Sequence, residues 1–139
     1  MATRAAACHC GQLELDVTGE PFAVSICHCL DCQRRTGSAF GMQAGFKADQ
    51  VSVTGRYDDF TRISDESDRK AHVFHFCPDC GVTVCWARET GPTRFGIPVG
   101  TFNDPAFPAP SVSFWEQARY AWSPHVGDVK HWDTQPPPA

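Results

Sequence analysis

The chain has 139 residues, a length typical of one domain that can bury a hydrophobic core. Its formal net charge of -4 indicates no basic surface of the kind that binds nucleic acid or anionic membranes, and no run approaches the roughly 18 apolar residues of a membrane span. We therefore expect neither a nucleic-acid nor a membrane partner. Because the first residues contain no apolar segment like that of a secretory signal, the cytoplasm is the expected compartment.

The predicted fold is mainly β, because β-branched and aromatic residues recur in short runs that Gly, Pro and Asp interrupt. Residues 13–17 (LELDV) alternate apolar and polar side chains, and we expect them to form a hairpin with residues 21–27. Further strands are expected at residues 38–46, 51–55, 57–63, 72–76, 82–88 and 94–100. The one expected helix is short and lies around residues 31–36.

Two segments are expected to be irregular. The polar stretch at residues 64–70 (SDESDRK) is predicted to be a solvated loop. Residues 104–139 begin with the proline-rich DPAFPAP and end with PPPA, so they are predicted to form a less regular C-terminal tail of the same single domain.

Seven of the eight cysteines fall into three tight groups, which is how metal ligands are distributed. The groups are CHCG at 8–11, CHCLDC at 27–32 and FCPDCG at 76–81. A disulfide framework is the less favoured alternative, because a reducing compartment and cysteines two residues apart both argue against it.

The first and third groups together match a closed structural zinc site. C-P-x-C-G is the zinc-knuckle turn, in which backbone amides point at the thiolates and glycine takes a positive φ. The two cysteines of CHCG, two residues apart on an extended chain, project to the same side. We therefore predict that one structural zinc is bound by Cys8, Cys10, Cys77 and Cys80.

The central group offers only Cys27, Cys29 and Cys32. Three protein ligands with one open position are typical of catalytic zinc. Three thiolates around Zn2+ leave a net charge of about -1, which makes the metal a poor acid for water but suitable for binding and deprotonating a soft thiol. The group therefore favours chemistry on a thiol substrate over hydrolysis.

Cys85 keeps an alternative open. If it were the fourth ligand of the central group, both sites would be closed and the protein could be a non-catalytic zinc module that binds a protein partner. The aromatic residues of the tail would then be candidates for the contact surface, namely Phe114, Trp115, Tyr120, Trp122 and Trp132. Since VTVCWAR (82–88) has the composition of a core strand, a buried free thiol is the favoured interpretation of Cys85.

The order CHCG, CHCLDCQRRTGSAF, FHFCPDCGVTVCW resembles the glutathione-dependent formaldehyde-activating enzyme family, whose type activity is S-(hydroxymethyl)glutathione synthase. The resemblance implies a β-tent fold of small antiparallel sheets, with residues 1–139 forming one zinc-binding domain. It implies two zinc ions per chain: a structural one on Cys8, Cys10, Cys77 and Cys80, and a catalytic one on Cys27, Cys29 and Cys32. The implied activity is that of a zinc-dependent carbon–sulfur lyase or synthase acting on a thiol adduct, with glutathione as the thiol, of a small carbonyl compound such as formaldehyde.

Other candidate residues have competing interpretations. Arg34 and Arg35 could pair with the carboxylates of a peptide thiol, or could be solvated helix residues. Among the histidines, His9 and His28 are expected to point away from the metal. His125 and His131, in the tail, could supply a general base. The remaining two, His72 and His75, lie in an expected strand and are candidates for the core.

Overall fold

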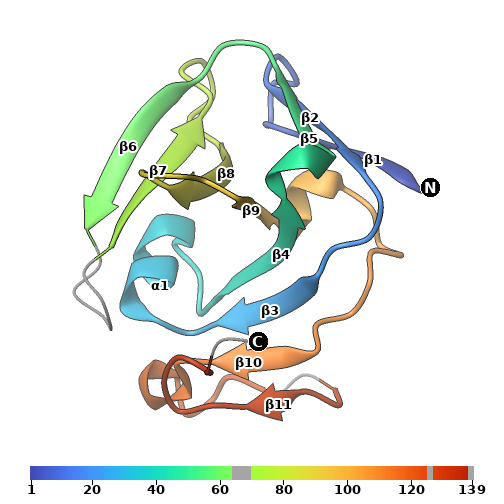
Figure 1. The fold of residues 1–139 in the computed structure, drawn as a ribbon. Coiled ribbons are helices and arrows are strands. Elements are labelled where there is room, and N and C mark those ends of the chain that lie inside the picture. The colour runs from blue at the N-terminus through green and yellow to red at the C-terminus, as the bar shows by residue number, and fades with distance from the viewer. Residues whose placement is uncertain (64–69, 125–126, 138–139) are drawn as a thin grey trace. The chain divides into compact units, whose positions relative to one another are not determined.

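The computed structural model describes residues 1–63, 70–124 and 127–137. The chain divides into two compact units: the first comprises Met1–Phe22 and Ala44–Phe107, and the second comprises Ala23–Gln43 and Pro108–Ala139. Strands make up most of the regular structure (Figure 1), so the prediction of a mainly β fold with small sheets is confirmed. No helix in the described part of the chain is long and apolar enough to span a membrane.

One sheet of the first unit consists of β1 (Thr3–Ala7), β2 (Glu14–Thr18) and β5 (Val51–Thr54), with β2 in the centre and antiparallel to both neighbours. Leu15 and Val17 of β2 are fully buried, as the alternation of the sequence predicts. The predicted hairpin between residues 13–17 and 21–27 is wrong, because β2 pairs with β1 and β5 instead.

Four further strands of the first unit follow one another as an antiparallel meander. They are β6 (Asp58–Ile63), β7 (Ala71–Phe76), β8 (Thr83–Arg88) and β9 (Arg94–Pro98). Phe74 of β7 stacks on Trp86 of β8 with ring centroids 5.5 Å apart. Gly96 of β9 lies opposite Trp86, and a Cβ at Gly96 would come within 2.5 Å of the indole ring. Glycine is therefore required for β9 to lie this close to the ring.

β4 (Gly41–Lys47) begins in the second unit and ends in the first. In the first unit it is followed by the 3-10 helix η1 (Ala48–Gln50), and η2 (Val99–Phe102) follows β9. Phe46 is fully buried and packs on Phe102, whose ring stacks in turn on Phe107 at a centroid distance of 4.6 Å. These aromatic contacts form part of the core of the first unit.

The second unit places β3 (Ala23–Cys27) parallel to β10 (Val112–Phe114), which is parallel in turn to β11 (Lys130–His131). The helix α1 (Leu30–Thr36) follows β3 directly, and η3 (Glu116–Ala118) follows β10. The expected short helix is confirmed. Residues 64–69 of the predicted loop lie outside the described residues, and so do the last two residues of PPPA.

α1 has clear boundary signals at both ends. The Cys29 side chain caps its N-terminus by accepting a hydrogen bond from the backbone N–H of Cys32. Gly37 ends the helix with a φ of +65°, and its N–H donates to the carbonyl of Gln33 at 2.8 Å. A cysteine cap is unusual, and it brings two sulfurs of the central cysteine group to the same end of the helix.

Candidate metal centres

The structure brings Cys8, Cys10, Cys77 and Cys80 together in the first unit, and these residues are called the four-cysteine cluster below. Their sulfur atoms all lie within 4.8 Å of one another. The sulfur of Cys10 lies 3.6 Å from that of Cys8 and 3.7 Å from that of Cys77. Four sulfurs at about 2.3 Å from a tetrahedral zinc would be about 3.8 Å apart. The distances between the sulfur atoms therefore fit a zinc ion bound by all four cysteines.

Two similar backbone turns position these cysteines. In the first turn the N–H of Cys8 donates to the carbonyl of Leu13 at 3.0 Å, and in the second the N–H of Cys77 donates to the carbonyl of Val82 at 3.0 Å. Gly11 and Gly81 lie inside the turns at φ +84° and +80°, a region that L side chains rarely adopt. The CPDCG pattern indicated the second turn, and the first turn has the same function after β1.

Donor groups in these turns point at the sulfurs. Gln12 Nε2 donates to Cys77 Sγ at 3.0 Å, and the backbone N–H of Asp79 donates to the same sulfur at 3.4 Å. Although desolvation raises the pKa of Cys77, the hydrogen bonds from Gln12 and from backbone N–H groups lower it to about 6. Hydrogen bonding from the Val82 N–H likewise lowers the pKa of Cys80.

Cys10 behaves differently from Cys77 and Cys80 when the cluster is free of metal. The backbone N–H of Gln12 lowers its pKa, but desolvation and the thiols of Cys8, Cys77 and Cys80 raise it to about 12. In the metal-free cluster the raised pKa of Cys10 thus favours its protonated form, whereas the lowered pKa values of Cys77 and Cys80 make their protons easier to lose. A bound cation would replace the proton of Cys10.

The second unit brings together Cys27, Cys29 and Cys32, called the three-cysteine cluster below. Their sulfurs lie within 4.8 Å of one another, and all three residues are buried. Cys27 ends β3, Cys29 caps α1, and Cys32 lies in the first turn of α1. The group therefore depends on a strand and a helix that only two residues, His28 and Cys29, separate. Its three sulfurs fit a metal ion that keeps a further position for another ligand.

Two thiols of the three-cysteine cluster, those of Cys27 and Cys29, have raised pKa values in the absence of metal. Hydrogen bonding with Cys29 and with Cys32, followed by burial, raises the pKa of Cys27 far above its usual range. The hydrogen bond with Cys27 lowers the pKa of Cys29, but the thiol of Cys32 and burial outweigh it, so that this pKa is also raised. Metal binding at this cluster therefore has to displace more tightly held protons than at Cys77 and Cys80.

Phe114 and Trp115 pack against the three-cysteine cluster and form an apolar wall on it. Trp115 has a φ of +57°, the left-handed region that non-glycine residues rarely adopt. The C-terminal segment holds it there: the Trp115 N–H donates to the carbonyl of Thr134 at 3.3 Å, and Nε1 donates to Gln135 Oε1 at 3.1 Å. The side chains of Phe114 and Trp115 are half-buried, whereas Tyr120, Trp122 and Trp132, the other aromatic residues of the suggested contact surface, are exposed.

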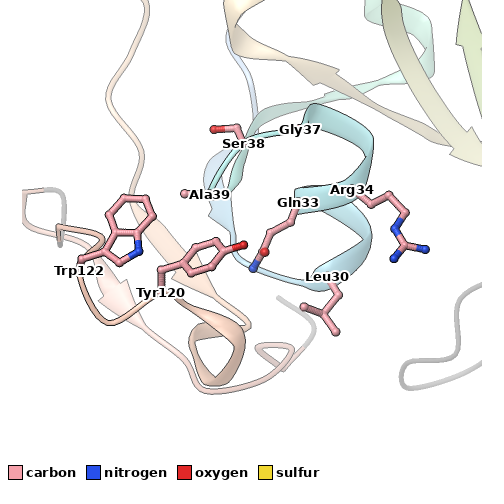
Figure 2. A pocket seen from close by; sticks show the side chains of 8 residues that line it. All are labelled: Leu30, Gln33, Arg34, Gly37, Ser38, Ala39, Tyr120 and Trp122. Atoms are coloured by element: carbon pink, nitrogen blue, oxygen red, sulfur yellow. The ribbon is translucent and has the colours of Figure 1, made fainter.

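A pocket of about 560 Å³ lies beside α1 in the second unit. Leu30 and Gln33 of the helix line one side, and Tyr120 and Trp122 line the other (Figure 2). The rings of Tyr120 and Trp122 stack at a centroid distance of 5.2 Å, and Gln33 Nε2 donates to the carbonyls of His28 and Ala118. The sequence contained no signal for this pocket, because its two sides are distant in the chain.

The histidines have the following positions. His28 is buried, its Nε2 lies 3.1 Å from Ser113 Oγ, and its ring meets Phe40 edge-on, so it is a core histidine. His75 Nδ1 pairs with Asp59, and His131 Nδ1 pairs with Glu116 Oε1 at 2.6 Å. His125 lies outside the described residues.

Cys85 lies on β8 of the first unit and is fully buried. It is opposite His75 of β7, and within the first unit it is not a member of the four-cysteine cluster. Burial, with a smaller effect of the Asp59 charge, raises the pKa of the Cys85 thiol to about 12. These are the properties of a neutral core thiol.

Comparisons with known proteins relate the chain to a sequence family and to a solved structure. The sequence model of the family described as "Glutathione-dependent formaldehyde-activating enzyme" matches residues 3–118. A crystal structure of a Rhodobacter sphaeroides protein is similar in fold, with a TM-score of 0.53 and 23% sequence identity, over 70% of this chain and 85% of that chain. No curated protein matches the chain.

Proposed function

The chain belongs to the glutathione-dependent formaldehyde-activating enzyme family, and on this premise we propose that it is a zinc-dependent carbon–sulfur lyase or synthase. Its substrate would be a thiol, glutathione, together with a small carbonyl compound such as formaldehyde. The observation that supports this most is the three-cysteine cluster, which offers three buried sulfurs and a position for a further ligand. We propose the cytoplasm as the compartment, since a reducing environment would keep these thiols available.

The two clusters would have different functions. Cys8, Cys10, Cys77 and Cys80 would hold a structural zinc that joins the turn after β1 to the turn after β7, two segments far apart in the sequence. Cys27, Cys29 and Cys32 would hold the zinc of the reaction. A zinc bound by these three residues would supply positive charge that favours the thiolate form of an incoming thiol.

The proposed reaction forms a hemithioacetal. The thiol sulfur forms a bond to the carbonyl carbon, the carbon–oxygen double bond becomes a single bond, and the proton lost by the thiol reaches the oxygen through solvent. The reverse reaction breaks the carbon–sulfur bond and returns the proton to sulfur. Phe114 and Trp115, which pack against the three-cysteine cluster, would exclude water from one side of the reacting atoms.

The pocket beside α1 would hold the part of the thiol that does not react. It begins at Leu30, one residue after Cys29, and its 560 Å³ is a size that accommodates a small peptide. The stacked rings of Tyr120 and Trp122 offer an apolar wall, and the exposed Arg34 could pair with a carboxylate. We expect Trp122→Ala to weaken glutathione binding several-fold without changing the zinc content.

The decisive experiment measures exchange between formaldehyde and glutathione by NMR. We expect the zinc-loaded protein to accelerate the exchange between S-(hydroxymethyl)glutathione and its components, which broadens their resonances. Cys32→Ser should abolish that effect, while the zinc of the four-cysteine cluster remains bound. A zinc-loaded protein that neither binds glutathione nor changes the exchange would contradict the proposal. Binding of a protein partner by a chain with no such activity would favour the non-catalytic zinc module.

A further inference from the structure

Arg35 lies in the last turn of α1, three residues after Cys32. The two adjacent arginines of this helix differ in their surroundings: Arg34 is exposed and lines the pocket, whereas Arg35 is half-buried and its Nη2 atom is fully buried. Because residues three apart on a helix are neighbours, Arg35 extends along the same side of α1 as Cys32. Its position therefore differs from that of a solvated helix residue.

Arg35 and Cys32 both lie next to Gly41, the first residue of β4. A Cβ at Gly41 would lie 3.2 Å from Arg35 Nη2, 3.2 Å from Cys32 Cβ and 3.5 Å from Cys32 Sγ. The guanidinium and the sulfur thus both lie next to the same point. The absence of a side chain at Gly41 leaves room for both.

The chemistry of the three-cysteine cluster makes this proximity consequential. Three thiolates around a divalent cation carry a net charge of about -1 in surroundings formed by Phe114 and Trp115, and burying an uncompensated charge is costly. A guanidinium remains protonated at any physiological pH, so its charge is permanent. Asp31 lies four residues before Arg35, a spacing at which side chains on a helix are neighbours.

We propose that Arg35 is a positioning residue of the three-cysteine cluster, whose guanidinium beside Cys32 compensates the thiolate charge and strengthens metal binding there. The inference rests on the proposed function, because it assigns the metal of that cluster. It also gives the two arginines different roles, since Arg34 would contact only the thiol substrate. Arg35 would thereby contribute to zinc affinity and Arg34 to thiol affinity.

The test is the affinity of the full chain for its more weakly bound zinc, measured by competition with a chromophoric chelator. We expect Arg35→Met to weaken this affinity by about 10-fold or more, the range found for residues that support metal ligands, and Arg35→Lys to recover part of the loss. Arg34→Met is the matched control and should leave zinc affinity unchanged. The tightly bound zinc of the four-cysteine cluster should be retained in every variant, which reports that the chain is folded.

The outcomes separate the two proposals. If the unsubstituted chain binds two zinc ions but Arg35→Met and Arg35→Lys bind them as tightly as it does, or if Arg34→Met weakens binding equally, the role of Arg35 is refuted while the proposed function stands. If the unsubstituted chain binds a single zinc ion, both are refuted. If Arg35→Met does not fold, Arg35→Gln provides the same comparison, because it also removes the positive charge while keeping a polar side chain.

Discussion

The side-chain amide of Gln12 donates a hydrogen bond of 3.0 Å to the sulfur of Cys77, from a turn 65 residues earlier in the chain. The backbone of Arg56 holds that amide at both ends: Arg56 N–H donates to Gln12 Oε1 at 3.0 Å, and Gln12 Nε2 also donates to the Arg56 carbonyl at 2.8 Å. The Arg56 side chain pairs in turn with Asp79 of the knuckle turn. Gln12 therefore connects the two turns of the four-cysteine cluster independently of a metal.

This relationship predicts that Gln12→Ala weakens zinc retention at the four-cysteine cluster by about 10-fold, because a donor to a thiolate ligand is lost. The loss of a hydrogen bond to a charged sulfur should also lower the free energy of unfolding by about 2 kcal/mol. Zinc release to a chelator and thermal unfolding measure the two effects. Gln117→Ala, at an exposed position, is the matched control and should change neither.

The pKa shifts predict that acid removes zinc from the three-cysteine cluster first. In the three-cysteine cluster the pKa values of Cys27 and Cys29 are raised, so protons compete with the metal there at a higher pH. In the four-cysteine cluster the pKa of Cys10 is raised too, but the lowered pKa values of Cys77 and Cys80 preserve their thiolates to lower pH. Zinc content measured after equilibration at decreasing pH should fall in two steps, and Cys32→Ser should remove the step at the higher pH. A single step that releases both ions would contradict the prediction.

The raised pKa of Cys27 also predicts how the stability of the metal-free protein depends on pH in alkaline solution. Because the folded pKa of Cys27 lies above the ordinary thiol value of 9.0, the native state binds more protons than the unfolded state above that pH. The free energy of unfolding of the metal-free protein should therefore fall as the pH rises beyond 9.0. Urea unfolding at a series of pH values measures this dependence.

The positive φ of Trp115 predicts an unusual order of stability among its variants. At a φ of +57° alanine retains the strain of a left-handed L residue, whereas glycine does not. Trp115→Gly should therefore be more stable than Trp115→Ala by about 1 kcal/mol, although both lose the ring that packs against the three-cysteine cluster. Chemical denaturation of the two variants compares them directly, and an alanine variant as stable as the glycine variant would show that this backbone conformation is not retained.

Gly41 predicts a local effect on one metal only. In Gly41→Ala the new methyl group would press on Cys32 and Arg35, so the zinc of the three-cysteine cluster should bind several-fold more weakly while the other zinc is retained. Gly100→Ala is the control, because a Cβ there would meet nothing within 4 Å and its φ is not positive. Zinc affinity in the two variants should differ at the three-cysteine cluster and agree at the four-cysteine cluster.

The cysteine spacing predicted the composition of both clusters because each pair of ligands is local. CHCG and CPDCG each form a turn within about six residues, and CHCLDC places its sulfurs at one strand–helix junction. Most strands and the short helix α1 were predicted from the same kind of local pattern. Cys85 was correctly interpreted as buried from its place in an apolar strand.

Features that depend on distant contacts were not predicted. β1 (TRAAA) shows no alternation of apolar and polar side chains, and β10 and β11 have three and two residues, which is too short for a periodic signal. The false hairpin followed from the proximity of two strands in sequence, whereas β2 pairs with strands on both of its sides. Trp115 packs against the cysteines, and the Arg35 guanidinium lies next to Gly41. Both contacts depend on tertiary packing, which a local sequence pattern does not predict.

Zinc stoichiometry in the purified chain and in two cysteine variants tests the central claim most directly. The claim is that Cys27, Cys29 and Cys32 hold a zinc ion without a fourth cysteine. We predict two zinc ions per chain in the unsubstituted protein and in Cys85→Ala, and one in Cys32→Ser. Loss of the second zinc in Cys85→Ala would contradict the claim, because it would make Cys85 the fourth ligand and the protein a closed zinc module.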